Sequence, residues 1–134
     1  AQPPIVVLTS NRTREIHDAV KRRCLYHWVG FPDAQRELAI LQRRVPNAGL
    51  ALAQQIVAFV QKLREIELYK LPGIAETIDW ATALTELDRV ALDPETIADT
   101  VGALLKYQDD IARINGSEGR LALDAVKAEL RATG

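Results

Sequence analysis

Residues 50–68 read LALAQQIVAFVQKLREIEL, and this stretch decides the fold class. Its apolar residues recur at spacings of three and four, which places them on one face of an α-helix. That face consists of Leu52, Ile56, Phe59, Val60 and Leu63. Because a helix with one apolar stripe must bury the stripe against other elements, the stretch predicts a helix in the core of a bundle.

Helical periodicity continues on both sides of this stretch. The predicted helices cover residues 34–45, 50–68, 75–90 and 94–115, followed by a last helix that Ser117 can cap. Asp33 stands where the first of them needs an N-cap, and Asp93 followed by Pro94 is typical of the start of the fourth. This fourth helix is expected to be long, because it runs until the turn signal of Asn115 and Gly116.

The first part of the chain has a different pattern. Residues 5–9, IVVLT, form an unbroken β-branched and apolar run typical of a strand buried on both faces, and residues 24–29, CLYHWV, form a second strand-like run. A short helix is predicted between them, over residues 15–23. Two such strands cannot make a self-sufficient sheet. The expected fold is therefore mainly α, with a small strand-helix-strand remnant of an α/β domain over residues 1–31 and a helical bundle over 32–134.

Composition limits the function classes. The 134 residues include 17 Lys and Arg against 18 Asp and Glu, so the formal net charge of -1 gives no sign of a nucleic-acid or membrane-surface binder. No apolar run approaches the roughly 20 residues of a membrane span. A single Cys and the lack of a signal-peptide pattern favour the cytoplasm. Since no Met occurs, even at position 1, we expect the chain to be cut or processed from a longer product.

Two stretches resemble a known family. Residues 7–29, VLTSNRTREIHDAVKRRCLYHWV, and residues 71–81, LPGIAETIDWA, are similar to the MoxR branch of the AAA+ ATPases, especially the accessory ATPases encoded beside carbon-monoxide dehydrogenase genes. The resemblance implies a C-terminal fragment in which residues 1–31 end the nucleotide-binding domain and 32–134 form the lid domain.

The same resemblance implies what the parent protein does. It would be a ring-forming homo-oligomer that uses ATP and Mg²⁺ and couples ATP hydrolysis to chaperone-like remodelling or metalloenzyme maturation. The implied partners are neighbouring subunits, a protein with a von Willebrand factor A domain and a metalloenzyme client. No membrane and no nucleic-acid partner is expected.

Asn11 is the first candidate site residue. It follows the first predicted strand at its carboxyl end, where open α/β sheets bind ligands. The family has its sensor 1 residue at this position, whose amide contacts a γ-phosphate oxygen and helps to orient the attacking water. The alternative is an Asn that caps the next helix or makes an Asx-turn.

Arg22 and Arg23 end the predicted short helix, where the family has an arginine finger that reaches into the ATP site of the neighbouring subunit. A guanidinium suits the charge that develops on γ-phosphate oxygens. Family members usually read Asp-Arg-Phe, so Arg23 takes the finger position, Arg22 replaces the acid and remains the alternative finger, and Cys24 replaces the aromatic residue. A structural alternative is that these cations only complement the helix dipole, a role that Lys21 fits as well.

Other expected parts of an ATPase are absent from the sequence. There is no G-x-x-x-x-G-K-[ST] loop and no apolar strand ending in Asp-Glu, so the fragment is not expected to hydrolyse ATP alone or to bind a cofactor. No arginine lies between Pro72 and Arg89, where sensor 2 is usually found. No sensor 2 residue is therefore assigned. Lid closure on nucleotide would rely on backbone groups or Lys70, or its coupling to nucleotide would be weaker.

The remaining candidates have weaker patterns. His17, Cys24 and His27 do not have zinc-ligand spacing, and Cys24 is predicted to be a buried small residue. The pairs Glu65/Glu67 and Asp109/Asp110 are expected on solvated helix faces. Two rival functions stay open: a helical adaptor module that binds no nucleotide, and the lid of a DNA-associated AAA+ protein, against which the near-neutral charge counts.

Overall fold

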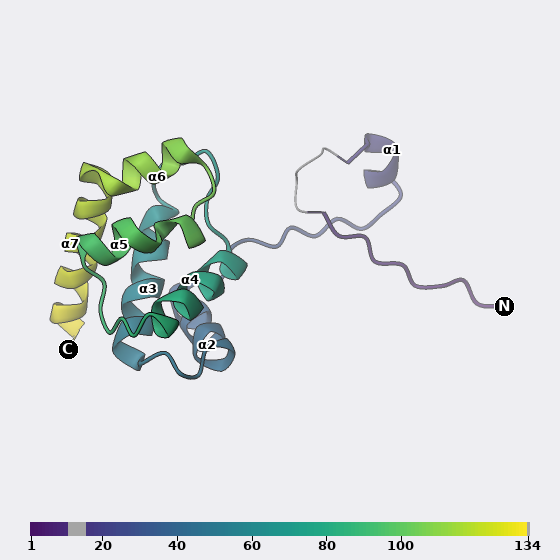
Figure 1. Ribbon diagram of the computed structural model, residues 1–134. Helices are drawn as coiled ribbons and strands as arrows, with labels where there is room; N and C mark the ends of the chain where they lie inside the picture. Colours follow the sequence, from purple (N-terminus) through teal and green to yellow (C-terminus); the bar gives the residue numbers. More distant parts are fainter. Residues whose placement is uncertain (11–15, 134) are drawn as a thin grey trace. The chain divides into compact units, whose positions relative to one another are not determined.

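The computed structural model describes residues 1–10 and 16–133. The chain divides into two compact units, residues 1–30 and residues 31–134, which are described separately (Figure 1). Of the parts described, no helix is both long and apolar enough to cross a membrane.

Within residues 1–10 and 16–30, the N-terminal unit has one short regular element. Helix α1 (Asp18–Lys21) follows His17, whose Nδ1 accepts a hydrogen bond from the backbone of Ala19 at 3.2 Å. The strands predicted over residues 5–9 and 24–29 are not confirmed, because no strand occurs within residues 1–10 and 16–30. The physical reason is the lack of a covering layer: Ile5 is 96% exposed and Leu25 fully exposed, whereas a strand of this composition needs neighbours on both faces.

The C-terminal unit is a helical bundle, which confirms the mainly helical fold class. Its elements are α2 (Ala34–Arg44), α3 (Leu50–Leu63), α4 (Ile74–Glu86), α5 (Pro94–Thr100), the 3₁₀ turn η1 (Val101–Ala103), α6 (Gln108–Asn115) and α7 (Ser117–Thr133). Asp33 caps α2 by accepting from the backbone of Arg36 at 2.8 Å, and Asp93 caps α5 by accepting from that of Thr96 at 2.7 Å. The hydrogen bond from the backbone N–H of Thr96 is the main cause that lowers the pKa of Asp93.

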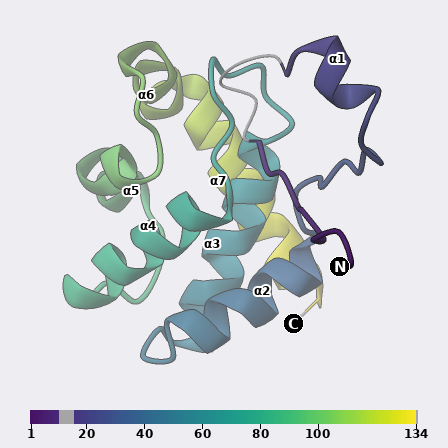
Figure 2. The same ribbon diagram turned by 90° about the vertical axis from the view of Figure 1, so that its right-hand side faces the viewer.

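Helix α3 forms the centre of the core. In Figures 1 and 2 it runs through the bundle, and it packs against α2, α4 and α7. All five residues of the predicted stripe are buried: Leu52, Ile56, Phe59, Val60 and Leu63. Beside them lies Trp80 of α4, whose ring centroid is 5.7 Å from that of Phe59. The Nε1 of Trp80 donates to Thr100 Oγ1 at 2.8 Å. The apolar periodicity therefore identified the buried face of α3 correctly.

The prediction of one long helix over residues 94–115 is wrong. The chain leaves helical geometry after η1 and resumes it at α6. Gly102, a poor helix former, lies in η1 just before the break, and the amine of Lys106 donates to the carbonyls of Gly102 and Ala103 at 3.1 and 3.0 Å. Leu104 and Leu105 are both buried, so the irregular segment still contributes to the core.

Helices α6 and α7 meet at a tight corner. Gly116 ends α6, and Gly119 is buried in the first turn of α7. A Cβ atom at Gly119 would lie 2.7 Å from the carbonyl carbon of Ile114 and closer still to its oxygen. Since both groups are backbone, only a glycine allows this approach.

The end of α4 carries the one residue with positive φ among the non-glycine residues described, Asp88 at 53°. The backbone N–H of Asp88 donates to Thr85 O at 3.1 Å, and that of Arg89 donates to Leu84 O at 2.9 Å. These two bonds form a Schellman motif, in which glycine is the preferred residue at the left-handed position. The helix therefore stops at Glu86 and not at Val90, as the apolar pattern had suggested.

We expect Asp88→Gly to stabilise the bundle by roughly 0.5–1 kcal/mol for two reasons. It removes a side chain from a residue with a left-handed backbone, and it removes a negative charge from a helix C-terminus. Thermal unfolding should then shift upward by about 2–6 °C. Asp88→Asn separates the two causes, since it removes only the charge. If Asp88→Ala were as stable as Asp88→Gly, backbone strain would not be the reason.

Candidate functional site

The residues predicted for phosphate chemistry belong to the N-terminal unit. Asn11 lies outside the described residues. Arg22 caps the end of α1 through its backbone N–H, which donates to Asp18 O at 2.9 Å, and Arg23 follows with a bond to Val20 O at 3.1 Å. Both side chains are exposed. The geometry leaves either guanidinium accessible to a partner, and it leaves the helix-dipole interpretation open as well.

Cys24 was expected to be buried, and that expectation is wrong. Its thiol is free and exposed, because the apolar run that follows it is itself exposed and forms no core around it. Within residues 1–10 and 16–133, no three His, Cys, Asp or Glu side chains form a group that could hold a metal ion.

A buried acid, Glu37 of α2, is the polar feature that the sequence reasoning missed. Its side chain is fully buried, and its carboxylate accepts from Arg64 Nη1 at 3.0 Å and Nη2 at 2.6 Å. Gln61 Nε2 donates to it at 3.1 Å and the hydroxyl of Thr77 at 3.4 Å. These four residues are called the Glu37 network below. The bidentate pair with Arg64 is the arrangement that can compensate a buried carboxylate.

The Glu37 network binds the chain just before two helices, α2 and α4. Arg64 Nε donates to Pro72 O at 2.8 Å, just before α4 begins, and Gln61 Nε2 donates to Pro32 O at 3.2 Å, just before α2 begins. The guanidinium of Arg64 also lies 4.5 Å from the ring centroid of Phe31. Residues 31–32 and 72 are therefore fixed to the same buried ion pair.

One signal in the sequence could have revealed this network. Glu37 lies four residues before Leu41 and eight before Val45, so it falls on the buried face of α2. An acid at such a position needs a buried cation as its partner. Arg64, the C-cap residue of the central helix α3, is that cation.

The start of α4 corresponds to the region where sensor 2 was sought. Gly73 is its N-cap, and the Glu76 carboxylate accepts from the Gly73 N–H at 3.0 Å. The nearest preceding arginine, Arg64, has a side chain only 6% exposed and is committed to Glu37. The side chain of Lys70 is exposed. The sequence left Lys70 and the backbone as groups that could contact nucleotide. The Lys70 side chain is accessible, whereas the backbone N–H of Gly73 already donates to Glu76.

A second buried acid, Asp110 of α6, corrects the expectation that it lies on a solvated face. Its side chain is 2% exposed, and its two oxygens accept from the backbone N–H groups of Tyr69 at 2.8 Å and Lys70 at 3.1 Å. The loop after α3 is thereby attached to the first turn of α6. Burial of a carboxylate is tolerated here because both oxygens have donors.

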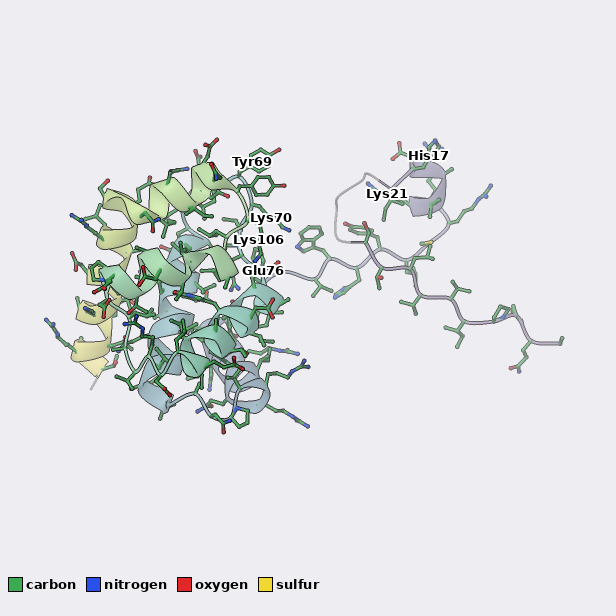
Figure 3. The ribbon with its side chains drawn as sticks, viewed as in Figure 1. His17, Lys21, Tyr69, Lys70, Glu76 and Lys106 are labelled. Carbon is green, nitrogen blue, oxygen red and sulfur yellow. The ribbon has the colours of Figure 1, made fainter. Side chains whose placement is uncertain are left out.

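Above this attachment, two tyrosines and two lysines share one surface. The rings of Tyr69 and Tyr107 lie with centroids 4.4 Å apart and planes at 52°. Figure 3 shows Tyr69, Lys70 and Lys106 along one edge of the bundle. We call Tyr69, Lys70, Lys106 and Tyr107 the tyrosine–lysine surface.

Arg113 secures the other end of the same loop. Its Nη1 donates to the carbonyl of Glu67, while Nε and Nη2 each donate to the carboxylate of Glu118 at 2.7 Å. The hydrogen bond from Arg113 lowers the pKa of the Glu118 carboxyl. Residues 67–70 are thus held to α6 from both sides.

An open hollow of about 520 Å³ lies where the start of α3 meets the end of α4. Its polar lining mixes Glu86 and Asp88 with Arg89, so carboxylates and a guanidinium stand side by side. This mixture favours no one ligand chemistry.

The chain matches no protein-family model, no curated protein and no solved structure with which it was compared. Its function is therefore inferred from its own residues and geometry.

Proposed function

We propose that this chain carries the last elements of the nucleotide-binding domain and the helical lid of a MoxR-type AAA+ ATPase. The observation that carries the proposal is the run of residues 7–29, in which Asn11 and the pair Arg22-Arg23 occupy the sensor 1 and arginine-finger positions, followed directly by a helical bundle. Of these parts, only the helical bundle is established by the structure. The ATPase assignment depends on the resemblance.

The internal connections of the bundle support a role as a lid that moves as one body. Residues 31–32, the first of the bundle, contact the buried Glu37 network through Pro32 and Phe31. A displacement of this entry segment would be passed to α3 through Gln61 and Arg64 rather than lost in a loose linker. Domain closure requires such rigid elements connected at short hinges.

In the proposed reaction, the residues of this chain position and stabilise charge. ATP and Mg²⁺ would be bound by a phosphate loop and an acidic strand that the printed sequence does not contain. The Asn11 amide would orient the attacking water, and Arg23 or Arg22 would offer its guanidinium to the γ-phosphate oxygens of the neighbouring subunit's ATP. The energy would drive remodelling or maturation of a client protein.

We expect Arg23→Ala in the ring-forming parent to lower ATP turnover by about 10³ to 10⁵, because a finger acts mainly on transition-state charge. Nucleotide affinity should change little. Phosphate release and binding of a fluorescent ATP analogue measure the two quantities. Arg36→Ala is the matched control, since Arg36 is an exposed arginine on α2.

A mixing experiment tests action between subunits. Asn11→Ala and Arg23→Ala rings should each be inactive, but rings assembled from both variants should recover part of the turnover, since some interfaces then combine an intact Asn11 with an intact Arg23. Normal turnover of Arg23→Ala would transfer the role to Arg22, and normal turnover of the Arg22/Arg23 double alanine variant would remove the finger altogether.

The rival proposal is a helical adaptor that binds no nucleotide. The bundle has a buried core of its own, and the printed sequence holds no phosphate loop, so a helical module is compatible with both facts. The coding sequence upstream of Ala1 separates the two. A phosphate loop and an Asp-Glu strand there support the ATPase, and their absence supports the adaptor.

A further inference from the structure

The boundary between the two units falls between Gly30 and Phe31, and the residues on its two sides differ in their attachments. Within residues 1–10 and 16–133, Gly30 takes part in no hydrogen bond. Among the same residues, a Cβ added to Gly30 would meet only Trp28 Nε1, at 3.8 Å. Gly30 therefore lacks the attachments that fix the residues after it.

Each of the three residues that follow has a contact of its own. The Phe31 ring lies against the guanidinium of Arg64, with 4.5 Å from its centroid to the central carbon. The carbonyl of Pro32 accepts from Gln61 Nε2 at 3.2 Å, and the proline ring fixes its own φ. The side chain of Asp33 caps α2. Three consecutive residues are thus bound to α2 or α3, beginning directly after Gly30.

The same arginine also binds the start of α4. Arg64 Nε donates to Pro72 O at 2.8 Å, and a Cβ at the N-cap residue Gly73 would lie 4.0 Å from Phe31 Cε1, an ordinary contact distance. The side chain of Arg64 is itself fixed, since it is 6% exposed and makes two hydrogen bonds to the buried Glu37 carboxylate. One buried guanidinium therefore holds the chain at the starts of both α2 and α4.

We propose that Arg64, Gln61 and Phe31 form a clamp that sets the C-terminal limit of the joint between the two units at Gly30. The bundle then begins as a rigid body at Phe31, and a force that reaches Phe31 from the preceding chain is passed directly to the starts of α2 and α4. Without the clamp, residues 30–32 would act as a longer linker that absorbs such a force. The clamp is a property of this chain and does not depend on ATP hydrolysis.

NMR relaxation of the backbone amides in the full chain tests the clamp. The order parameters of Phe31 and Asp33 should be close to the rigid value of about 0.85, as in α3, and that of Gly30 should lie below about 0.6. Through-space transfer between the Phe31 ring protons and the Gly73 α-protons should also be observed, because the ring lies beside this N-cap.

A double variant removes the clamp without breaking the buried ion pair. Phe31→Ala with Gln61→Ala deletes the ring and the bond to the Pro32 carbonyl, while Glu37 keeps both hydrogen bonds from Arg64. The bundle should keep a cooperative thermal transition, and the order parameter of residue 31 should fall to that of Gly30.

The matched control is Leu121→Ala with Gln54→Ala, which removes an exposed apolar side chain from α7 and an exposed amide from α3. It should leave residue 31 rigid. The proposal is overturned if wild-type Phe31 is as mobile as Gly30, if Gly30 is as rigid as α3, or if residue 31 stays rigid in the double variant. The wild-type measurements decide the question even if the double variant does not fold.

Discussion

Gly119→Ala is expected to destabilise the helical bundle by about 3 kcal/mol or more, because a methyl group cannot fit against backbone atoms. The added Cβ would lie 2.7 Å from the carbonyl carbon of Ile114, so α6 and α7 would have to separate. For a domain whose total stability is roughly 5–15 kcal/mol, this loss is large. Chemical denaturation followed by circular dichroism measures it directly.

The matched control is Gly102→Ala. Gly102 is exposed and does not have positive φ, and a Cβ added to it would meet no atom within 4 Å. The substitution should therefore change stability by about 0.5 kcal/mol at most or raise it slightly. Equal losses for the two substitutions would show that the corner between α6 and α7 tolerates a side chain.

Glu37→Gln is the second substitution with a large expected effect. It keeps the size of the side chain but leaves the guanidinium of Arg64, 6% exposed, without its counter-charge. Breaking a buried ion pair in this way costs about 3–5 kcal/mol. The free energy of unfolding from denaturant titration is the quantity to measure.

Two further variants establish the cause. Glu129→Gln breaks the solvent-accessible ion pair with Lys62, whose N–O distance of 2.7 Å is similar, and should cost about 1 kcal/mol or less. The double variant Glu37→Met with Arg64→Met removes both charges and should recover part of the loss. If Glu37→Gln cost no more than Glu129→Gln, the buried pair would not hold the bundle together.

The sequence predicted the core well because the core depends on local periodicity. The stripe from Leu52 to Leu63 needs only the helical repeat to be recognised, and its burial was confirmed. The caps at Asp33 and Asp93 were also recognised from local signals, since the bonds they form span three residues.

The same reasoning failed where distant residues decide the structure. Gly102 disfavours the predicted helix over 94–115 locally, but the start of α6 is held by distant contacts. Tyr107 packs against Tyr69, and Asp110 binds the loop at 69–70, about 40 residues away along the chain. The burial of Glu37 likewise depends on Arg64, 27 residues further on. Helical periodicity places Glu37 on the buried face of α2, but it does not identify Arg64 as its partner or connect the loop at 69–70 to α6.

The candidate phosphate site could be predicted only through the resemblance. Arg22 and Arg23 are exposed after α1, which suits a finger but also suits simple helix-end cations. The strands on either side of α1 were predicted from their apolar composition, and they are not formed. A strand needs neighbouring strands to pair with, and the apolar pattern of a segment does not show whether they exist. The roles of Asn11, Arg22 and Arg23 therefore remain predictions.

The attachment of the loop at 69–70 to Asp110, in the first turn of α6, has an evolutionary consequence. This carboxylate constrains the lengths of two connections. Tyr69 and Lys70, in the connection from α3 to α4, must reach Asp110, and Asp110 follows directly after the connection from η1 to α6. An insertion beside Tyr69 and Lys70, or one that displaced the first turn of α6, would break this attachment. Relatives of this chain should therefore tolerate length changes elsewhere on the surface before they tolerate them in these two connections.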